Sequence, residues 1–249
     1  MKRFAMAALM VCLYAGPVCA VETAIPTEAP ATAAPEPTLS RARQLYVDRI
    51  ALFKEENAKL DPAKRYVVFL GDSLTQGAPL ETLFPDTPTL NRGIGSDGIT
   101  WFPARSFDRG VINRIKESVA DCQASTIFLL IGTNDVAHGE VEMDHWKSGY
   151  RELVALIRKE APQAKLVIQT LPPSRPPYTK VELLNARVEQ FNVFLKEFAA
   201  EEKLPLLDLN AIVKGDDGLL RAEFTGDGLH LKRDAYELWA VEVRKHLPE

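Results

Sequence analysis

Residues 66–73 read YVVFLGDS, and this stretch decides how the rest of the chain is interpreted. Five apolar residues followed by glycine are typical of a strand that is buried on both faces of a parallel sheet. Similar apolar runs occupy residues 126–131 and 166–171, and shorter candidates lie at residues 89–91 and 206–209. The sequence therefore predicts a parallel sheet of about five strands.

Apolar residues recur at helical spacing around these runs. Such stripes lie in residues 143–157, 184–198 and 236–243, and a further stripe precedes the first strand at residues 39–53. A stripe of this kind is the core-facing side of a helix; for residues 39–53, binding to a partner is the alternative. Strands that alternate with helices imply right-handed crossovers and helices on both faces of the sheet. We therefore predict an α/β fold with three layers, α/β/α.

The composition fits one ordinary globular domain. The chain has 249 residues, of which 46% are hydrophobic and 26% are charged, close to the average for such domains. Residues 21–38 contain four prolines and no aromatic residue, so we predict a Pro/Ala-rich linker there. The folded domain is expected at residues 39–249, because we find neither an internal repeat nor a second core.

The first twenty residues have the features of a secretory signal peptide. Lys2 and Arg3 precede an apolar segment, and Val18-Cys19-Ala20 supplies the small residues of a cleavage site. The alternatives are an uncleaved anchor, a buried first helix, or a lipoprotein modified at Cys19. We predict a secreted or periplasmic protein with no stable membrane insertion after cleavage.

Loss of this segment would change the charge and the cysteine count. Cleavage after Ala20 removes Lys2 and Arg3, which shifts the formal charge from −4 to −6. Only Cys122 then remains, so no intrachain disulfide can form. No cluster of lysine and arginine marks a nucleic-acid-binding surface, and no paired histidine spacing marks a metal site. We expect neither a nucleic acid partner nor a metal ion.

Three polar segments lie outside the predicted core. Ser73 directly follows the first strand, where the N–H groups of a helix start favour negative charge; its other role there would be a helix cap. Asn134 lies in the segment GTND and can offer an amide to an oxyanion or simply form a turn. Asp227 and His230 are three residues apart, a spacing at which a carboxylate can orient an imidazole, although metal sites and surface turns share it.

Taken together, these segments resemble the sequence blocks of the GDSL hydrolases, also called the SGNH family. Residues 71–74 (GDSL), 91–97 (NRGIGSD), 132–135 (GTND) and 227–230 (DGLH) are similar to four blocks of that family, in the family's order. The resemblance covers residues 66–247 and implies a flavodoxin-like SGNH fold and a serine esterase that needs no cofactor. The surroundings of the blocks look most like the family's branch of acetylhydrolases that act on a platelet-activating phospholipid.

The resemblance implies a role for each residue of these blocks. Ser73 would attack the acyl carbonyl, His230 would take its proton, and Asp227 would hold the imidazole ring. The oxyanion would be bound by the backbone N–H of Ser73, the backbone N–H of Ser96 and the side chain of Asn134.

The second block contains one departure from the family pattern. Ser96 stands where the family has glycine, so a positive φ at this position would penalise serine. Gly95 is the alternative donor of the second oxyanion N–H. Further candidates for substrate binding are Asp72, Gly95, Trp101 and His138, which lie within or beside the blocks.

We predict a carboxylic ester hydrolase for short acyl groups, acetyl above all. Secretion favours O-acetyl groups on carbohydrates, so a small-molecule or glycan ester is the expected partner. We find no long insertion that could serve as the lid of a long-chain lipase. The alternatives are a lysophospholipase or thioesterase, acyl transfer to another hydroxyl, and a non-catalytic carbohydrate-binding relative.

Overall fold

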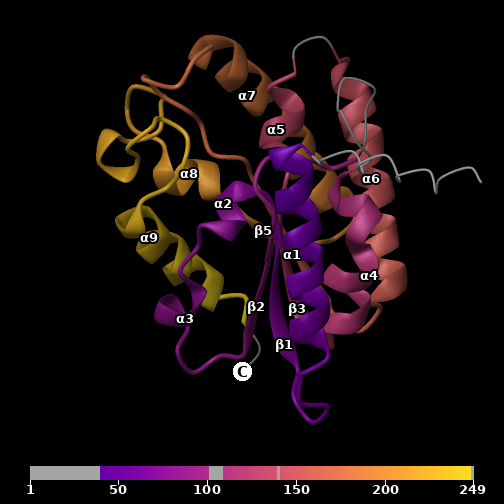
Figure 1. The fold of residues 1–249 in the computed structure, drawn as a ribbon. Helices are drawn as coiled ribbons and strands as arrows, with labels where there is room; N and C mark the ends of the chain where they lie inside the picture. Colours follow the sequence, from indigo (N-terminus) through magenta and orange to yellow (C-terminus); the bar gives the residue numbers. More distant parts are fainter. Residues whose placement is uncertain (1–39, 101–108, 139–140, 248–249) are drawn as a thin grey trace, which may run out of the picture. The chain divides into compact units, whose positions relative to one another are not determined.

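The computed structural model describes residues 40–100, 109–138 and 141–247, and its centre is one parallel sheet. The strands run in the order β2-β1-β3-β4-β5 and every neighbouring pair is parallel (Figure 1). They are β1 (Tyr66–Gly71), β2 (Thr89–Gly93), β3 (Ala124–Leu130), β4 (Lys165–Gln169) and β5 (Leu206–Leu207). The predicted α/β class and the sheet of about five parallel strands are confirmed.

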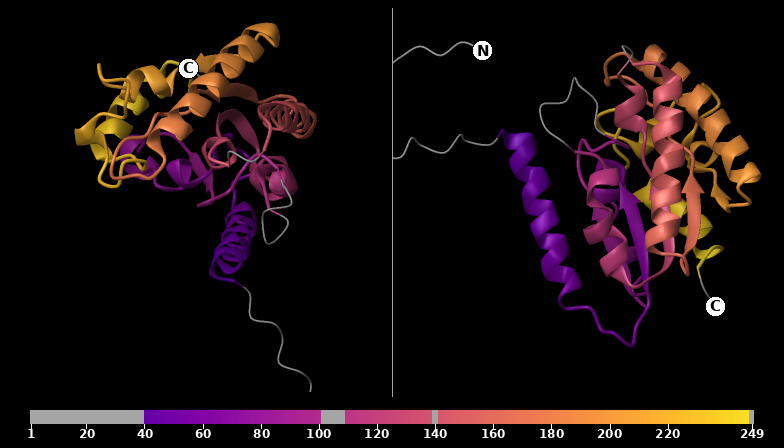
Figure 2. Two further views of the ribbon diagram at one scale, coloured as in Figure 1. Left: turned by 90° about the horizontal axis from the view of Figure 1, so that it is seen from above. Right: turned by 90° about the vertical axis from the view of Figure 1, so that its right-hand side faces the viewer.

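Helices cover both faces of the sheet (Figures 1 and 2). One face carries α4 (Ile115–Ser118), α6 (Met143–Glu160) and α7 (Val181–Glu201), and the other carries α3 (Leu80–Leu83) and α9 (Arg233–Arg244). The shorter elements are α2 (Ser73–Gln76), α5 (Thr133–Val136), α8 (Leu209–Val213) and the 3-10 helices η1 (Val111–Arg114), η2 (Ala120–Cys122) and η3 (Ala222–Phe224). None of the described helices is long and apolar enough to cross a membrane.

Aromatic rings pack within both helical layers. Tyr150 of α6 is fully buried, and its ring meets that of Phe191 of α7 edge-on, with centroids 5.8 Å apart. Trp239 of α9 packs on the ring of Phe69 of β1 at 5.2 Å and donates its indole N–H to Gln169 of β4 at 2.6 Å. The stripes predicted for residues 143–157, 184–198 and 236–243 therefore face the core.

The two edge strands differ from their predicted limits. The run at residues 206–209 forms a strand only over Leu206–Leu207, because the Asp208 carboxylate accepts a hydrogen bond from the Ala211 N–H at 3.2 Å and starts α8. β2 instead runs two residues further than predicted, to Gly93. A Cβ at Gly93 would collide with the backbone of Gln76, so the close approach of β2 to α2 requires glycine there.

Helix α1 (Arg41–Asn57) precedes the sheet and packs on it through one side. Ser40 caps its N-terminus, and the Tyr46 hydroxyl donates to the Gly110 carbonyl at 3.4 Å. Phe53 is fully buried. The residues from Leu39 to Glu249 form one compact unit, so this helix packs on its own domain, in agreement with the preferred interpretation of residues 39–53.

The loops that follow β1, β2 and β3 leave the same edge of the sheet. Gly71 at the end of β1 is paired with Gly93 of β2 on one side and with Leu130 of β3 on the other. This register brings the residues after each strand together at the carboxyl edge, where open parallel sheets build their sites.

Candidate active site

Ser73, His230 and Asp227 form a continuous chain of polar contacts. Ser73 is the first residue of α2, and its Oγ lies 3.0 Å from Nε2 of His230. The other ring nitrogen, Nδ1, lies 2.6 Å from Oδ2 of Asp227. A hydroxyl, an imidazole and a carboxylate in this order can activate the hydroxyl as a nucleophile.

The turn that carries Asp227 and His230 is held by its own backbone. Oδ1 of Asp227 accepts hydrogen bonds from the N–H groups of Leu229 at 3.0 Å and His230 at 2.8 Å, and a bridge between Thr225 and Leu231 closes the turn. Although desolvation opposes the shift, the hydrogen bonds from the His230 ring and from these N–H groups hold the pKa of Asp227 below its usual range. The carboxylate is therefore charged whenever His230 accepts a proton.

Gly228 lets this turn approach the segment that follows β4. Its φ of +84° lies in the left-handed region, and a Cβ there would collide with the Arg175 carbonyl oxygen. The Arg175 N–H also donates to the Gly228 carbonyl at 2.8 Å. The histidine turn is thus fixed against the β4 side of the molecule.

Asn134 lies in the first turn of α5, directly after β3. Its Nδ2 donates to the backbone carbonyl of Asp97 at 2.8 Å and approaches Oδ2 of Asp72 at 3.4 Å. The third block therefore meets both the residue before Ser73 and the end of the second block. To bind an oxyanion, the amide must give up one of these two hydrogen bonds, and its role as an oxyanion donor stays a prediction.

Ser96, in the second block, has the positive φ that penalises serine. Its φ is +59°, a conformation that disfavours residues other than glycine. The N–H of Gly95 is already engaged, because it donates to Oε1 of Gln76 at 2.6 Å. Within the described part of the chain, the N–H of Ser96 makes no hydrogen bond. The free N–H favours Ser96 over Gly95 as the second oxyanion donor, which stays a prediction.

Asp72 caps α2 from a buried position beside Ser73. Its Oδ1 accepts a hydrogen bond from the Leu74 N–H at 2.9 Å. Burial, together with the nearby charge of Asp97, raises the pKa of Asp72 to about 7. The side chain is enclosed in the protein, so its predicted contact with substrate is not supported, and its position is that of a support for the Ser73 turn.

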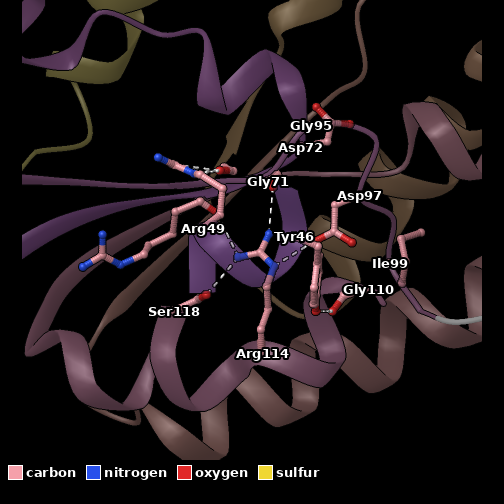
Figure 3. A network of polar contacts seen from close by, with 12 residues as sticks. Tyr46, Arg49, Gly71, Asp72, Gly95, Asp97, Ile99, Gly110, Arg114 and Ser118 are labelled. Atoms are coloured by element: carbon pink, nitrogen blue, oxygen red, sulfur yellow. Dashed lines mark hydrogen bonds and ion pairs between the residues drawn. The ribbon is translucent and has the colours of Figure 1, made fainter. Parts of the chain in front are cut away.

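Arg114 connects the ends of the strands that carry the site. No sequence motif identifies this residue. Figure 3 shows its guanidinium at the centre of a network: Nε contacts Oδ2 of Asp97 at 2.8 Å, and Nη2 donates to the Gly71 carbonyl at 2.8 Å. Nη1 donates to the Arg92 carbonyl and to Ser118. One buried side chain thus joins the ends of β1 and β2.

A signal for this residue was present in the sequence. Arg114 shares helical spacing with Val111, Ile115 and Ser118, all of which are buried. An arginine on the apolar side of a short helix is expected to face the core with partners there.

Helix α1 reaches the same region through Arg49. Its guanidinium donates to the Gly93 carbonyl at 2.9 Å and to the Asn91 carbonyl at 3.4 Å (Figure 3 labels Arg49). The guanidinium also lies over the ring of Phe53, with Cζ 4.8 Å from the ring centroid. The start of the second block is therefore anchored to α1.

The structure gives little support for a role of the remaining candidate residues in substrate binding. Trp101 lies outside the described residues. His138 is half-buried after α5, where its carbonyl accepts a hydrogen bond from Arg187 at 3.4 Å, and its contact with substrate stays a prediction. His145 is exposed on α6. In the residues that the structure describes, no group of three or more His, Cys, Asp or Glu side chains could hold a metal ion.

A parallel sheet covered by helices, with a serine, a histidine and an aspartate in contact at its carboxyl edge, is the arrangement expected of a hydrolase with an α/β fold. The model of the GDSL-like lipase/acylhydrolase family matches residues 69–238. The chain belongs to this family and is a carboxylic ester hydrolase.

Comparisons with individual proteins agree with this assignment. The chain is 31% identical over 177 residues to platelet-activating factor acetylhydrolase IB subunit alpha2 of Gallus gallus, covering 68% of this chain and 70% of that protein. It is 26% identical over 201 residues to N-acylneuraminate cytidylyltransferase of Streptococcus agalactiae, covering 77% of this chain; it spans only 43% of that protein's length. Among solved structures, the carbohydrate acetylesterase Est24 of Sinorhizobium meliloti superposes with a TM-score of 0.59 at 18% identity, covering 74% of this chain and all of Est24.

Proposed function

We propose that the protein hydrolyses short-chain carboxylic esters, acetyl esters of carbohydrates above all, through an acyl-enzyme on Ser73. The observation that carries the proposal is the chain of contacts from Asp227 through His230 to Ser73, with distances of 2.6 and 3.0 Å. Both lie within the reach that proton transfer requires.

The reaction proceeds in two halves. Nε2 of His230 takes the Ser73 proton while Oγ attacks the acyl carbonyl, and the charged Asp227 steadies the imidazolium. The imidazolium then protonates the alcohol oxygen as the bond between carbonyl carbon and alcohol breaks. Water, activated by the same imidazole, attacks the acyl-enzyme and releases the acid.

The negative oxygen of each tetrahedral intermediate needs hydrogen-bond donors. The backbone N–H of Ser73 at the start of α2, the N–H of Ser96 and Nδ2 of Asn134 are the three groups that we assign to it. Loss of one donor of this kind typically costs about 3 kcal/mol of transition-state stabilisation. Burial raises the pKa of Asp72 to about 7, so below that pH the neutral side chain does not repel the oxyanion.

Two observations support acetyl esters on a carbohydrate. The Gallus gallus relative is an acetylhydrolase, and Est24 is a carbohydrate acetylesterase. The proposed signal peptide would place the enzyme outside the cytoplasm, where acetylated glycans are available as substrates. The same machinery would serve a longer-chain enzyme, so the acyl preference is the quantity to measure.

Hydrolysis of p-nitrophenyl esters from acetyl to palmitoyl, with wild type and Ser73→Ala compared, tests the proposal. We expect activity on the short esters in the wild type and none above background in the variant. Acetylated xylan and acetylated chitooligosaccharides are then compared by acetate release. A preference for palmitoyl would support a lysophospholipase or thioesterase, and equal rates for wild type and Ser73→Ala would refute the nucleophile.

A further inference from the structure

A cavity of about 290 Å³ lies between α1 and the loop that follows β2. Its volume is near the lower end for small-molecule sites, which span roughly 300–1,000 Å³. One wall is formed by Leu45 and Leu52 of α1, and the opposite wall by Ile94 of the second block. The family match starts at residue 69, so the α1 wall is contributed by a segment outside the matched region.

The cavity borders the proposed nucleophile. Gln76, Gly95 and Ser96 also line it. A Cβ built on Gly95 would lie 4.0 Å from the Cβ of Ser73 and 3.3 Å from Oε1 of Gln76. The rim of the cavity formed by Gly95 and Gln76 is therefore next to the serine side chain.

The position of His230 decides which part of an ester can enter the cavity. The imidazole must protonate the leaving alcohol, so the alcohol lies on the side of His230. The histidine turn is fixed against the segment after β4, whereas the cavity lies beside the loop after β2. In the sheet, β1 lies between β2 and β4, and Ser73 follows β1. The part of the ester that points away from His230, toward the cavity, is the acyl group.

We propose that this cavity is the acyl-binding pocket and that it takes unbranched, uncharged acyl chains of up to about eight carbons. This proposal rests on the esterase function proposed above. A dry cavity of about 150 Å³ holds benzene, so a volume of 290 Å³ accommodates roughly ten carbon-sized atoms. A palmitoyl chain exceeds that space, which agrees with the short acyl groups proposed above.

The lining chemistry agrees with an apolar chain. Leu45 and Leu52 are 56% and 38% exposed, so an acyl chain in the cavity would cover apolar surface that is in contact with water. The Arg49 guanidinium also lines the cavity, and its Nε and Nη2 are engaged by the backbone carbonyls of Asn91 and Gly93.

A second charged group of opposite sign lies beside Arg49. Asp48 also lines the cavity, and its carboxylate accepts a hydrogen bond from Gln44 at 2.7 Å. The α1 wall thus carries one negative and one positive charge, and burying a charged chain end against it would cost more than burying an uncharged one.

Substitutions at Leu52 in the full chain test the pocket. With p-nitrophenyl acetate, butyrate, hexanoate, octanoate and palmitate, we expect Leu52→Trp to lower kcat/KM on hexanoate and octanoate about tenfold or more, the range for apolar pockets that exclude methylene groups. The rate on acetate is expected to fall less than the rates on the longer esters. Leu52→Ala is expected to shift the preferred chain toward greater length. Val47→Trp, on the exposed side of the same helix at 44% exposure, is the matched control.

Each other outcome contradicts the pocket. Equal loss on every ester, or the same chain-length change in Val47→Trp, would mean that α1 acts only as a structural support. The loss of kcat/KM in Leu52→Trp can also be compared for ethyl and p-nitrophenyl hexanoate. A loss that depends on which alcohol is present would mean that the cavity binds the alcohol. Failure of the esterase function itself is distinct, because Ser73→Ala would then hydrolyse acetate as fast as the wild type.

Discussion

Asp227 is the residue on which the orientation of His230 depends. In Asp227→Asn the amide can present its N–H₂ group to Nδ1, which favours the wrong tautomer, so we expect kcat to fall by roughly two to four orders of magnitude. Because the Asp227 side chain is more than half exposed, the free energy of unfolding should change little. Steady-state kinetics and urea unfolding check both expectations. Asp234→Asn, an exposed carboxylate of α9, is the control; full activity of Asp227→Asn would exclude the orienting role.

Asp72 makes the stability depend on pH in an unusual direction. The folded chain holds a proton on Asp72 up to about pH 7, whereas the unfolded chain releases it near pH 4. The stabilising contribution is thus complete below about pH 4 and is lost as the pH rises to 7. We expect Asp72→Asn, which stays neutral, to gain up to about 3 kcal/mol relative to wild type between pH 5 and pH 8.

Urea unfolding of wild type and Asp72→Asn at pH 5, 6, 7 and 8 measures this difference. Asp86→Asn, an exposed carboxylate before β2, should follow the wild type at every pH. A constant difference between wild type and Asp72→Asn would mean that Asp72 is charged throughout this range.

At the scale of residues, the sequence predicted the candidate catalytic residues better than the residues that hold them in place. Ser73, Asn134 and His230 occur in short motifs whose spacing reflects what a reaction needs. Arg114 has no such motif, because its four partners come from β1, β2, the loop after β2 and α4, and depend on the folded structure. The φ of Ser96 was likewise open, since only the path of the loop decides it.

At the scale of elements, Arg114 holds β1, β2 and α4 together. Within the described residues it is the only hydrogen-bond donor to the Asp97 carboxylate, and both side chains are buried. Arg114→Met leaves that carboxylate without a counter-charge, so we expect a loss of about 3–5 kcal/mol in unfolding free energy. Arg233→Met removes an exposed pair with Glu237 and should cost less than about 1 kcal/mol. Equal losses in urea unfolding would contradict the role of the buried network.

The strand predictions failed where a local polar group outweighed the apolar pattern. Residues 206–209 have the composition of a strand, but Asp208 caps α8 and ends β5 after Leu207. The central strands had no such competitor. Residues 66–70 and 126–131 lie inside the sheet, where burial on both faces enforces a continuous apolar run that can be recognised in the sequence.

For the whole molecule, the order of the strands explains why distant motifs meet. β1 lies between β2 and β3, so the loops that follow these three strands share one edge. The segment before α9 carries the histidine turn back to this edge. The alternation of strands and helices was sufficient to predict this edge as the site. It was not sufficient to predict that α1 would form one wall of a cavity beside it, because that depends on where the helix packs.

Helix α1 should therefore be an integral part of the folded protein, although the family match begins at residue 69. Phe53 is fully buried, and the guanidinium groups of Arg49 and Arg92 lie over its ring at 4.8 and 4.7 Å. Removing a buried phenylalanine alone typically costs about 3–5 kcal/mol, a large share of the roughly 5–15 kcal/mol that stabilises a domain. We expect a chain that begins at Leu39 to match the full chain in thermal midpoint and in acetate hydrolysis.

A chain that begins at Lys59 lacks α1 and should melt far lower or fail to fold. Circular dichroism melting curves of the two shortened chains, with Phe53→Ala in the full chain as an independent variant, measure the contribution of the helix. Val47→Ala, on the exposed side of α1, should shift the unfolding free energy by less than about 0.5 kcal/mol. If the chain from Lys59 melted like the full chain and kept its chain-length preference, α1 would be an appendage, and both its structural role and the acyl pocket would be refuted together.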